Sequence, residues 1–395
     1  MSNELNPDSG ADSGRGSGRG SGRGSGPDSD SRLGGHRLPA GGALVVGLDA
    51  GGTRTRAVLA SASDGRPLGE AVAGPGNALT VPVPQLTEHL VEALAGAVPE
   101  AARPRVVAVA GGFAGAAGTA DEPGRVNALT ALTEALRRLG IPAREVRISS
   151  DIEAAFAAAP GAPADGLALV AGTGAVAMRI TARHCEKTVG GDGWLLGDDG
   201  GGFWIGREAV RLALRMADRR GDDTALAALV GRELGVPEAV LPGLSPEGPT
   251  GTGAEAGGWP RAAREAYRRY VLPAVMAEPP VQLARFAPLV AGAARAGDAL
   301  ARAVLDEAAG HLADCVRALE PKPGESVVAT GGLLGPEGPL TAPLNRRLGA
   351  LGLVAHWVPD GSRGAVALAR LTHGGAHDGP HEGAPVTHPE PENNQ

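Results

Sequence analysis

The chain has 395 residues, which is long enough for two domains of ordinary size with a substantial buried core. Its net charge of −7 gives no electrostatic reason to expect binding to nucleic acid or to an anionic membrane surface. The two cysteines, Cys185 and Cys315, cannot build a disulfide framework, a four-cysteine zinc site or an iron–sulfur cluster, and this low count suits a reducing cytosol. No stretch has the ~18 to 20 apolar residues of a membrane span, and the first residues lack the apolar segment of a secretory signal. We therefore expect a cytoplasmic protein without nucleic-acid or membrane partners.

Both ends of the sequence have the composition of disordered segments. Residues 1–42 contain three copies of SGRG and almost no large apolar side chain, so they cannot bury enough surface to offset the entropy cost of ordering. Their Arg and Gly content is also compatible with an RNA-binding tail, although aspartates flank the repeats. Residues 375–395 are rich in Pro and Gly, and the histidines His377, His381 and His388 are compatible with a metal site or with a solvated tail. We predict disordered tails at both ends.

Between the tails, apolar runs of strand length alternate with stretches of helical periodicity. Strands are expected at 44–48, 57–60, 70–73, 105–110, 145–149, 166–170, 175–180, 326–330 and 353–357. Helices are expected at 126–139, 152–159, 204–216, 262–270 and 297–319, and the Gly- and Pro-rich residues 241–260 are expected to form a long loop. Pairs of strands followed by helices recur in both halves, which predicts an α/β protein with two similar units and mixed sheets, rather than a single parallel Rossmann sheet.

The first two expected strands are joined by a loop that contains Asp49 and the sequence Gly51-Gly52-Thr53, with no helix between them. A Gly-Gly turn lets the backbone approach a ligand closely and points successive N–H groups at phosphate oxygens. The Thr53 hydroxyl adds a donor, and a carboxylate such as Asp49 suits Mg²⁺. An ordinary β-hairpin turn favours the same residues. A Walker loop is excluded, because the GxxxxGK[ST] pattern is absent.

Two later loops repeat this composition of small residues. Gly172-Thr173-Gly174 follows a strand at the corresponding place in the second half, so that the two loops can clamp one polyphosphate from both sides. Gly331 and Gly332 follow a late strand and allow close contact beneath a nucleoside.

Acidic residues mark two further places. Asp151 opens the expected helix 152–159, where it serves either as an N-cap or as an acceptor for the proton of a hydroxyl nucleophile. The segment 190–202 is dense in glycine and holds three aspartates. It also contains bulky apolar residues that mobile linkers seldom have, so we expect an ordered ligand loop whose carboxylates suit the hydroxyl groups of a sugar.

Five motifs occur in an order that resembles the BadF/BadG/BcrA/BcrD-type ATPases of the actin–hexokinase–Hsp70 superfamily, and most of all the N-acetylglucosamine kinase branch. They are LDAGGTRTRAVL, SSDIEAAFA, AGTGAVA, GGDGWLLGDDGGGFWIG and ATGGLL. The resemblance spans about residues 44–371, outside which lie the two tails.

The resemblance implies two ribonuclease-H-like, actin-like ATPase domains with mixed sheets flanked by helices and a cleft between them. The domains would be 43–150 and 151–362, followed by a helix at 363–374 that packs back on the first domain. Such a protein closes over ATP, Mg²⁺ and an amino sugar, and small sugar kinases of this group are often homodimers.

The resemblance also implies roles for individual residues. Asp151 takes the place of the general base that deprotonates the sugar 6-hydroxyl, and Asp49 belongs to the metal region. The residues implied to bind ATP are Gly51, Gly52, Thr53, Gly172, Thr173, Gly174, Gly331 and Gly332. The residues implied to contact the sugar are Asn77, Asp151, Gly191, Asp192, Gly193 and Asp198.

Departures from the family pattern concern the sugar. Asp192 stands where the family commonly has Trp, and Ala114 stands where N-acetylglucosamine kinases tend to have Ser. We expect an N-acetylglucosamine kinase, with a kinase of glucosamine or of another hexosamine such as N-acetylmuramate as the alternative. A non-enzymatic sugar-sensing regulator is a remote alternative, because the N-terminal segment cannot supply a helix-turn-helix. The ATPase activators of radical dehydratases need bridging cysteines, and Cys185 and Cys315 lack that context.

Overall fold

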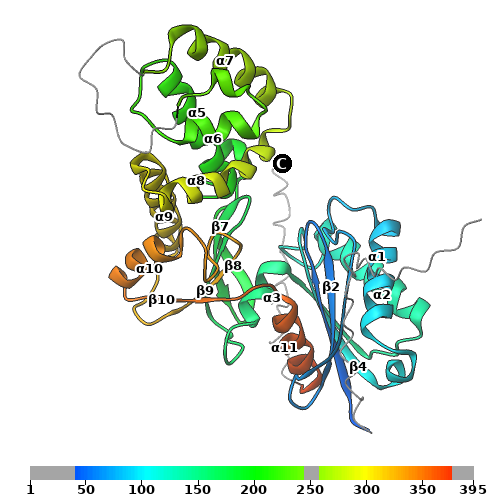
Figure 1. Ribbon diagram of the computed structural model, residues 1–395. Helices are drawn as coiled ribbons and strands as arrows, with labels where there is room; N and C mark the ends of the chain where they lie inside the picture. Colours follow the sequence, from blue (N-terminus) through cyan, green and yellow to red (C-terminus); the bar gives the residue numbers. More distant parts are fainter. Residues whose placement is uncertain (1–40, 244–257, 376–395) are drawn as a thin grey trace, which may run out of the picture. The chain divides into compact units, whose positions relative to one another are not determined.

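The computed structural model describes residues 41–243 and 258–375 (Figure 1). The predicted tails lie almost entirely outside the described residues, as does most of the predicted loop 241–260. The chain forms two five-stranded mixed sheets that are flanked by helices, which confirms the predicted α/β class. Within the described parts, no helix has the length and apolar character that crossing a membrane requires.

The first sheet has the strand order β3-β2-β1-β4-β5. Its strands are β1 (Leu44–Ala50), β2 (Thr55–Ser61), β3 (Pro67–Ala73), β4 (Val106–Phe113) and β5 (Glu145–Ser150). The first three strands are antiparallel neighbours, whereas β4 and β5 run parallel to β1. Strand β1 is almost fully buried along its length, as expected for a central strand covered on both faces.

Two layers of helices cover this sheet. On one side α1 (Val83–Ala97) packs against α2 (Pro123–Leu139) and against β2 and β3. On the other side α11 (Ser362–His373) packs against β1, β4 and α3 (Asp151–Ala157). A Cβ atom on Gly47 would lie 2.4 Å from the Val366 backbone nitrogen, so the absence of a side chain at Gly47 allows α11 to approach β1 this closely. The 3₁₀ helix η1 (Glu100–Arg105) precedes β4.

The helix predicted at 126–139 is confirmed as α2, and its predicted apolar face, formed by positions 126, 129, 132, 136 and 139, is buried only in part. Gly140 ends the helix in the left-handed conformation, with φ of 62°. Of these positions Leu132 and Leu136 are buried as expected, whereas Val126 and Leu129 are 46% and 47% exposed. The buried positions are Gly124, Ala128, Ala131, Leu132, Ala135 and Leu136. Alanines therefore make much of the contact, and the spacing of the larger apolar residues alone does not indicate this face.

The second sheet repeats the arrangement of the first, with the strand order β10-β9-β6-β7-β8. Its strands are β6 (Gly166–Ala171), β7 (Ala175–Thr181), β8 (His184–Gly190), β9 (Ser326–Thr330) and β10 (Val354–Trp357). Strands β6, β7 and β8 are antiparallel neighbours, and β9 and β10 run parallel to β6. The predicted recurrence of one motif in two mixed sheets is confirmed. All nine predicted strands are present, and β8 is the strand that the prediction missed.

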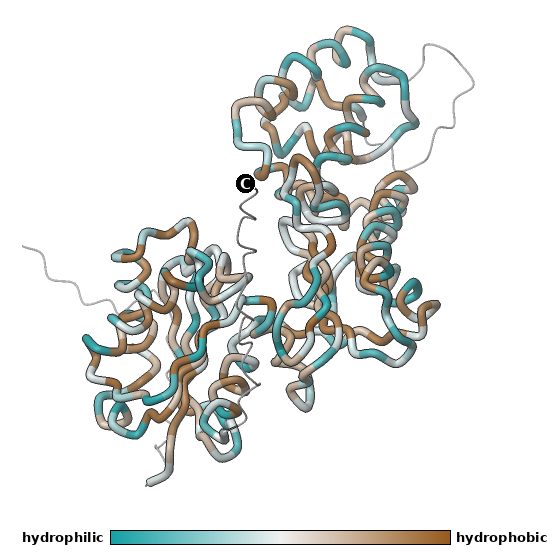
Figure 2. The backbone as a smooth tube through the Cα atoms, turned by 180° about the vertical axis from the view of Figure 1, so that it is seen from behind, coloured by the Kyte–Doolittle hydropathy of each residue, from teal (hydrophilic) through white to brown (hydrophobic). Residues whose placement is uncertain are grey.

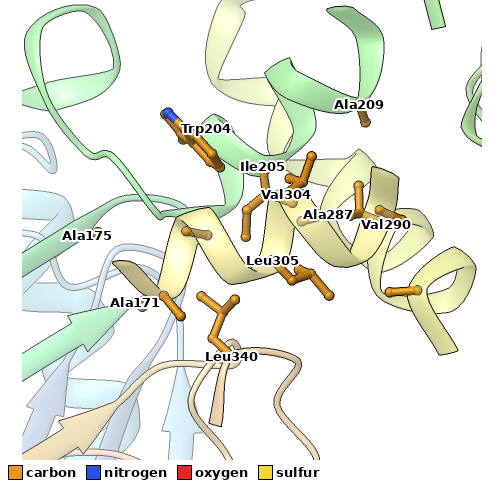
Figure 3. Close-up of a cluster of buried hydrophobic side chains, with 14 of the residues drawn as sticks. Ala171, Ala175, Trp204, Ile205, Ala209, Ala287, Val290, Val304, Leu305 and Leu340 are labelled. Atoms are coloured by element: carbon orange, nitrogen blue, oxygen red, sulfur yellow. The ribbon is translucent and has the colours of Figure 1, made fainter. Parts of the chain in front are cut away.

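Helices of the second half surround a core that is rich in alanine. They are α4 (Gly193–Leu196), α5 (Gly202–Ala217), α6 (Leu226–Glu233), α7 (Arg261–Met276), α8 (Ala287–Arg295), α9 (Ala299–Ala318) and α10 (Thr341–Ala350), with 3₁₀ helices η2 (Glu238–Val240) and η3 (Pro280–Phe286). Figure 2 shows how apolar residues follow the central strands of the sheets. Figure 3 shows part of the core, where side chains of α5, α8 and α9 meet, among them Ile205, Val290 and Leu305. Six of the ten aromatic residues are buried, among them Tyr267, whose hydroxyl donates to the carbonyl of Ala227 over 2.7 Å.

Candidate functional site

The first candidate loop is a tight β-hairpin turn that leaves the end of β1. Ala50 pairs with Thr55, and the Gly51 N–H donates to the Arg54 carbonyl over 2.9 Å. This geometry confirms the hairpin, while phosphate binding by the same turn stays a prediction. Neither Gly51 nor Gly52 has a positive φ, and a Cβ atom on Gly52 would meet nothing within 4 Å. Backbone conformation and packing therefore do not explain the glycine at 52, whereas the close approach of a ligand would.

Backbone φ and the space around a Cβ atom also divide the glycines of the two later loops into two kinds, those that the fold requires and those that it does not. The fold requires glycine at 174 and 331, because a side chain there would collide with its neighbours. A Cβ atom would lie 2.8 Å from the Asp198 carboxylate at 174 and 2.2 Å from the Ala171 carbonyl oxygen at 331. Gly172 and Gly332 lack a positive φ, and a Cβ atom on either would meet nothing within 4 Å. Each loop thus contributes one glycine that is free to let a ligand reach the backbone.

These two unexplained glycines line one pocket of about 440 Å³ in the second half of the chain. The lining residues are Gly172, Thr173, Gly202, Ala284, Ala287, Pro288, Ala291, Arg295, Gly332, Leu333 and Pro339. Apart from Thr173 and Arg295, their side chains are apolar or absent, as is usual for a pocket that binds a small molecule. The wall from η3 and α8 was missed by sequence reasoning. Most of its lining residues are alanines, which are equally typical of an ordinary packed helix.

Asp49 lies at the end of β1 beside two other carboxylates. Burial, followed by the charges of Asp360 and Asp151, raises the pKa of Asp49 from 3.8 to about 6. The Gly361 backbone N–H and the Arg56 charge act in the opposite direction and lower this pKa. Asp360 was missed by sequence reasoning, because the residue that joins β10 to α11 has no local signal that places it near β1.

Asp360 is held by an ion pair and by its own turn. The Arg56 guanidinium on β2 donates to Oδ2 of Asp360 over 3.0 Å, and both side chains are largely buried. Oδ1 of Asp360 accepts from the Ser362 N–H over 3.0 Å and from the Ser362 hydroxyl over 2.6 Å. Asp360 therefore has a fixed position, whereas its charge is only partly neutralised.

The carboxylates fit a divalent cation that arrives with a phosphate ligand. No group of three His, Cys, Asp or Glu side chains with metal-binding geometry occurs in the part of the chain that the structure describes. Mg²⁺ is usually held by one or two carboxylates together with substrate phosphates and water. A cation at Asp49 would also offset the repulsion that raises the pKa of this group, so the residues present fit the predicted metal region.

Asp151 is the first residue of α3, but it does not cap this helix. Ser150 is the N-cap: its hydroxyl accepts from the Glu153 N–H over 3.1 Å, and the Glu153 carboxylate accepts from the Ser150 N–H over 2.8 Å. The N-cap interpretation of Asp151 is therefore wrong, because this capping box already performs that role. Burial raises the pKa of Asp151, against the lowering effect of the Ile152 N–H, which donates to its carboxylate over 3.0 Å. A half-buried carboxylate that does not cap the helix is suited to proton transfer.

The loop around Asn77 is joined to the first hairpin through Ala114. The Ala114 N–H donates to Ala50 over 2.9 Å, and its carbonyl accepts from Ala78 over 2.8 Å. Asn77 Oδ1 accepts from the N–H groups of Leu79 and Thr80, over 2.9 and 3.1 Å. The Asn77 side-chain oxygen thus shapes its own turn, and the contact of Asn77 with a sugar stays a prediction.

The glycine-rich segment 190–202 lies against the second small-residue loop. Gly191 and Gly193 have φ values of +77° and +81°, which explains these two glycines by conformation. Asp192 is exposed, and Asp198 is placed with its carboxylate against Gly174, while the Ala175 N–H donates to Asp198 Oδ1 over 3.3 Å. The structure therefore gathers the predicted residues in two sets, one around the end of β1 and the other around the end of β6.

Comparison with known proteins identifies the family to which the sequence is similar. The sequence model of the BadF/BadG/BcrA/BcrD ATPase family matches residues 46–344. An N-acetylmuramic acid/N-acetylglucosamine kinase from Clostridium acetobutylicum is 28% identical over 185 residues, which is 46% of this chain. The matched region spans 57% of the length of that relative.

Solved structures share the fold at low identity. A candidate N-acetylglucosamine kinase from Chromobacterium violaceum has a TM-score of 0.55 and 24% identity, with 83% of this chain and 99% of that chain covered. A candidate N-acetylglucosamine kinase from Porphyromonas gingivalis has a TM-score of 0.56 and 18% identity, with 84% and 99% covered.

Proposed function

Because the chain belongs to the BadF/BadG/BcrA/BcrD ATPase family, we propose that it is a kinase that transfers the γ-phosphoryl group of ATP to the 6-hydroxyl of an amino sugar. The observation that carries this proposal is the pocket of about 440 Å³ lined by Gly172 and Gly332. Both glycines lack a conformational or packing reason, and both stand where the family motifs imply phosphate and nucleoside contacts. The pocket would take the nucleoside, with Thr173 directed at the phosphates.

In this proposal Asp151 is the general base. Its carboxylate takes the proton of the sugar 6-hydroxyl, the freed oxygen attacks the γ-phosphorus, and the bond to the leaving β-phosphate oxygen breaks to release ADP. The support for this role is that Ser150 performs the capping and that burial raises the pKa of Asp151 toward the working range of a base. Asp49 would hold the Mg²⁺ that accompanies ATP, and this ion would supply charge neutralisation for the transferred group.

N-acetylglucosamine is the substrate that we propose first. The relative from C. acetobutylicum is named for N-acetylmuramic acid and N-acetylglucosamine, and the similar solved structures carry the latter sugar in their descriptions. Glucosamine is the second candidate, because the exposed Asp192 carboxylate can pair with a free amine and Ala114 offers no hydroxyl to an acetamido group.

A panel of sugars tests the proposal. ADP release would be measured by a coupled assay with glucose, glucosamine, N-acetylglucosamine, N-acetylmuramate and N-acetylmannosamine. We expect release that depends on an amino sugar, with N-acetylglucosamine giving the highest kcat/KM. If glucosamine is the true substrate, Asp192→Asn should raise its KM several-fold and leave the KM of ATP unchanged. Sugar-independent ADP release, or none with any member of the panel, would refute the proposal.

A further inference from the structure

We infer that Asp198 is a positioning residue for the nucleotide, because its carboxylate holds the turn Gly172-Thr173-Gly174 from behind. The inference rests on the proposed kinase function. It differs from the role that the family motif implies, in which Asp198 contacts the sugar. Three sets of contacts support it.

The first is the position of the carboxylate itself. Cγ, Oδ1 and Oδ2 of Asp198 would each lie 2.8 Å from a Cβ atom on Gly174, so the carboxylate group packs flat on the Gly174 backbone. Its Oδ1 accepts from the Ala175 N–H over 3.3 Å, at the first residue of β7. The turn therefore has a side-chain support directly behind it, and this support requires the glycine at 174.

The second is the backbone around Asp198, which is bonded to the same turn. The Gly202 N–H donates to the Gly172 carbonyl over 2.8 Å, and the Phe203 N–H donates to the Thr173 carbonyl over 2.9 Å. The Gly201 N–H donates to the carbonyl of Asp198 over 2.9 Å, so the short segment from Asp198 to Phe203 is closed on itself. The segment and the turn thus form one hydrogen-bonded unit, in which Gly172, Thr173 and Gly202 line the pocket while Asp198 packs against Gly174.

The third is the backbone conformation of Asp198, whose φ is +59°. Left-handed conformations are uncommon for residues other than glycine, although Asn and Asp tolerate them better than other side chains do. A glycine would adopt this φ without strain but would leave the Ala175 N–H without its acceptor. The choice of Asp at this position is therefore explained by the carboxylate's contact with the turn.

A series of substitutions separates the conformational role from the side-chain role. Asp198→Asn keeps both the acceptor and the tolerance of positive φ, Asp198→Gly keeps only the conformation, and Asp198→Ala keeps neither. We expect nucleotide affinity to fall in the order Asn, Gly, Ala. The loss should reach about tenfold for Ala, equivalent to ~1.4 kcal/mol. Asp222→Asn, at an exposed position in another turn, should change nothing.

The deciding measurement is ADP binding by calorimetry in the absence of sugar, together with KM for ATP and for sugar. A contact made only with the sugar cannot alter ADP binding when no sugar is present. Weaker ADP binding and a higher KM for ATP, with the KM for sugar within twofold of wild type, would support the inference. Unchanged ADP binding together with a raised KM for sugar would overturn it.

Thermal unfolding of each variant, with binding measured well below its midpoint, shows that the folded protein is being compared. Failure of the kinase proposal would be visible separately, as absence of sugar-dependent ADP release by the wild-type protein.

Discussion

At the scale of single residues, the carboxylates that meet near the end of β1 lower the stability of the folded protein, because one of them, Asp49, is charged in a partly buried place beside two others. Asp49 is buried beside Asp360 and Asp151, and its pKa of about 6 means that the folded state prefers the protonated form. Between pH 3.8 and about 6 the folded protein therefore binds a proton that the unfolded chain has released. The contribution of Asp49 to the free energy of unfolding thus decreases as pH rises through this window, and the cost is fully present at neutral pH.

We therefore predict that Asp49→Asn stabilises the protein at pH 7.5 in the absence of Mg²⁺ and nucleotide. The free energy of unfolding should rise by about 1 to 2 kcal/mol, less than the full value of the pKa shift because of solvent screening. The gain should vanish below pH 3.8, where both states are protonated. Urea denaturation at the two pH values measures this, with Asp222→Asn as an exposed control. A loss of stability at pH 7.5 would mean that the hydrogen bond from Gly361 outweighs the cost of burial.

Asp151 leads to a prediction about catalysis. A general base must be deprotonated, and burial raises the pKa of Asp151 above its usual 3.8. The rate should therefore fall as pH decreases, with the acid limb of kcat/KM above pH 3.8 at saturating Mg²⁺. Asp151→Glu should retain a shifted limb at reduced rate. A flat profile down to pH 3.8 would contradict the assignment of the base.

At the scale of elements, glycines determine how closely α11 can pack. A Cβ atom on Gly364 would lie 1.7 Å from the Ala154 carbonyl oxygen of α3, so no side chain fits between these helices. We predict that Gly364→Ala lowers the free energy of unfolding by about 2 to 3 kcal/mol through overpacking.

The matched control is Gly349→Ala in α10, where a Cβ atom would meet nothing within 4 Å. This substitution should stabilise the protein by up to about 1 kcal/mol, because alanine has the higher helix propensity. Urea denaturation of both variants checks the pair. Equal effects of the two substitutions would show that the contact of α11 with α3 does not limit packing.

Which elements were predictable depends on how their residues are buried. Central strands such as β1 and β6 have continuous apolar runs, and the sequence alone indicates them. Strand β8 has the sequence HCEKTVG, lies at the edge of its sheet and has no fully buried residue, so it has no apolar pattern to detect. Helix α1 begins with Val83 and Pro84 and was not predicted. A proline in the first helical turn is a typical sign of a helix start, so this helix was predictable. Helix α8 is made of small residues, which leave its periodicity indistinct.

At the scale of the whole chain, the repeated sheet topology was predictable, whereas contacts between distant segments were not. The recurrence of a strand pair followed by a helix was enough to predict two mixed sheets. The contact of Arg56 with Asp360 joins residues 304 positions apart. Arg56 lies in the motif LDAGGTRTRAVL, but Asp360 belongs to none of the five motifs, so no sequence pattern pairs the two residues. The packing of the Asp198 carboxylate against Gly174 was likewise not predictable, since it depends on the three-dimensional path of residues 190–202, and the contact of Asp198 with the sugar stays a prediction. The domain boundaries at 43–150 and 151–362 remain a prediction.

The central claim is sugar-dependent phosphoryl transfer with Asp151 as the base, and one comparison tests it most directly. Formation of ADP and sugar 6-phosphate by the wild-type protein would be measured beside Asp151→Asn, with ADP and sugar binding determined for both by calorimetry. We predict that the wild-type protein forms ADP and sugar 6-phosphate from the preferred amino sugar in equal amounts. Asp151→Asn should lose at least a hundredfold in kcat, in line with the ~10² to 10⁴ that general-base catalysis contributes, while both ligands bind within a few-fold. Turnover by Asp151→Asn near the wild-type rate, or ADP formed without sugar phosphate, would contradict the account.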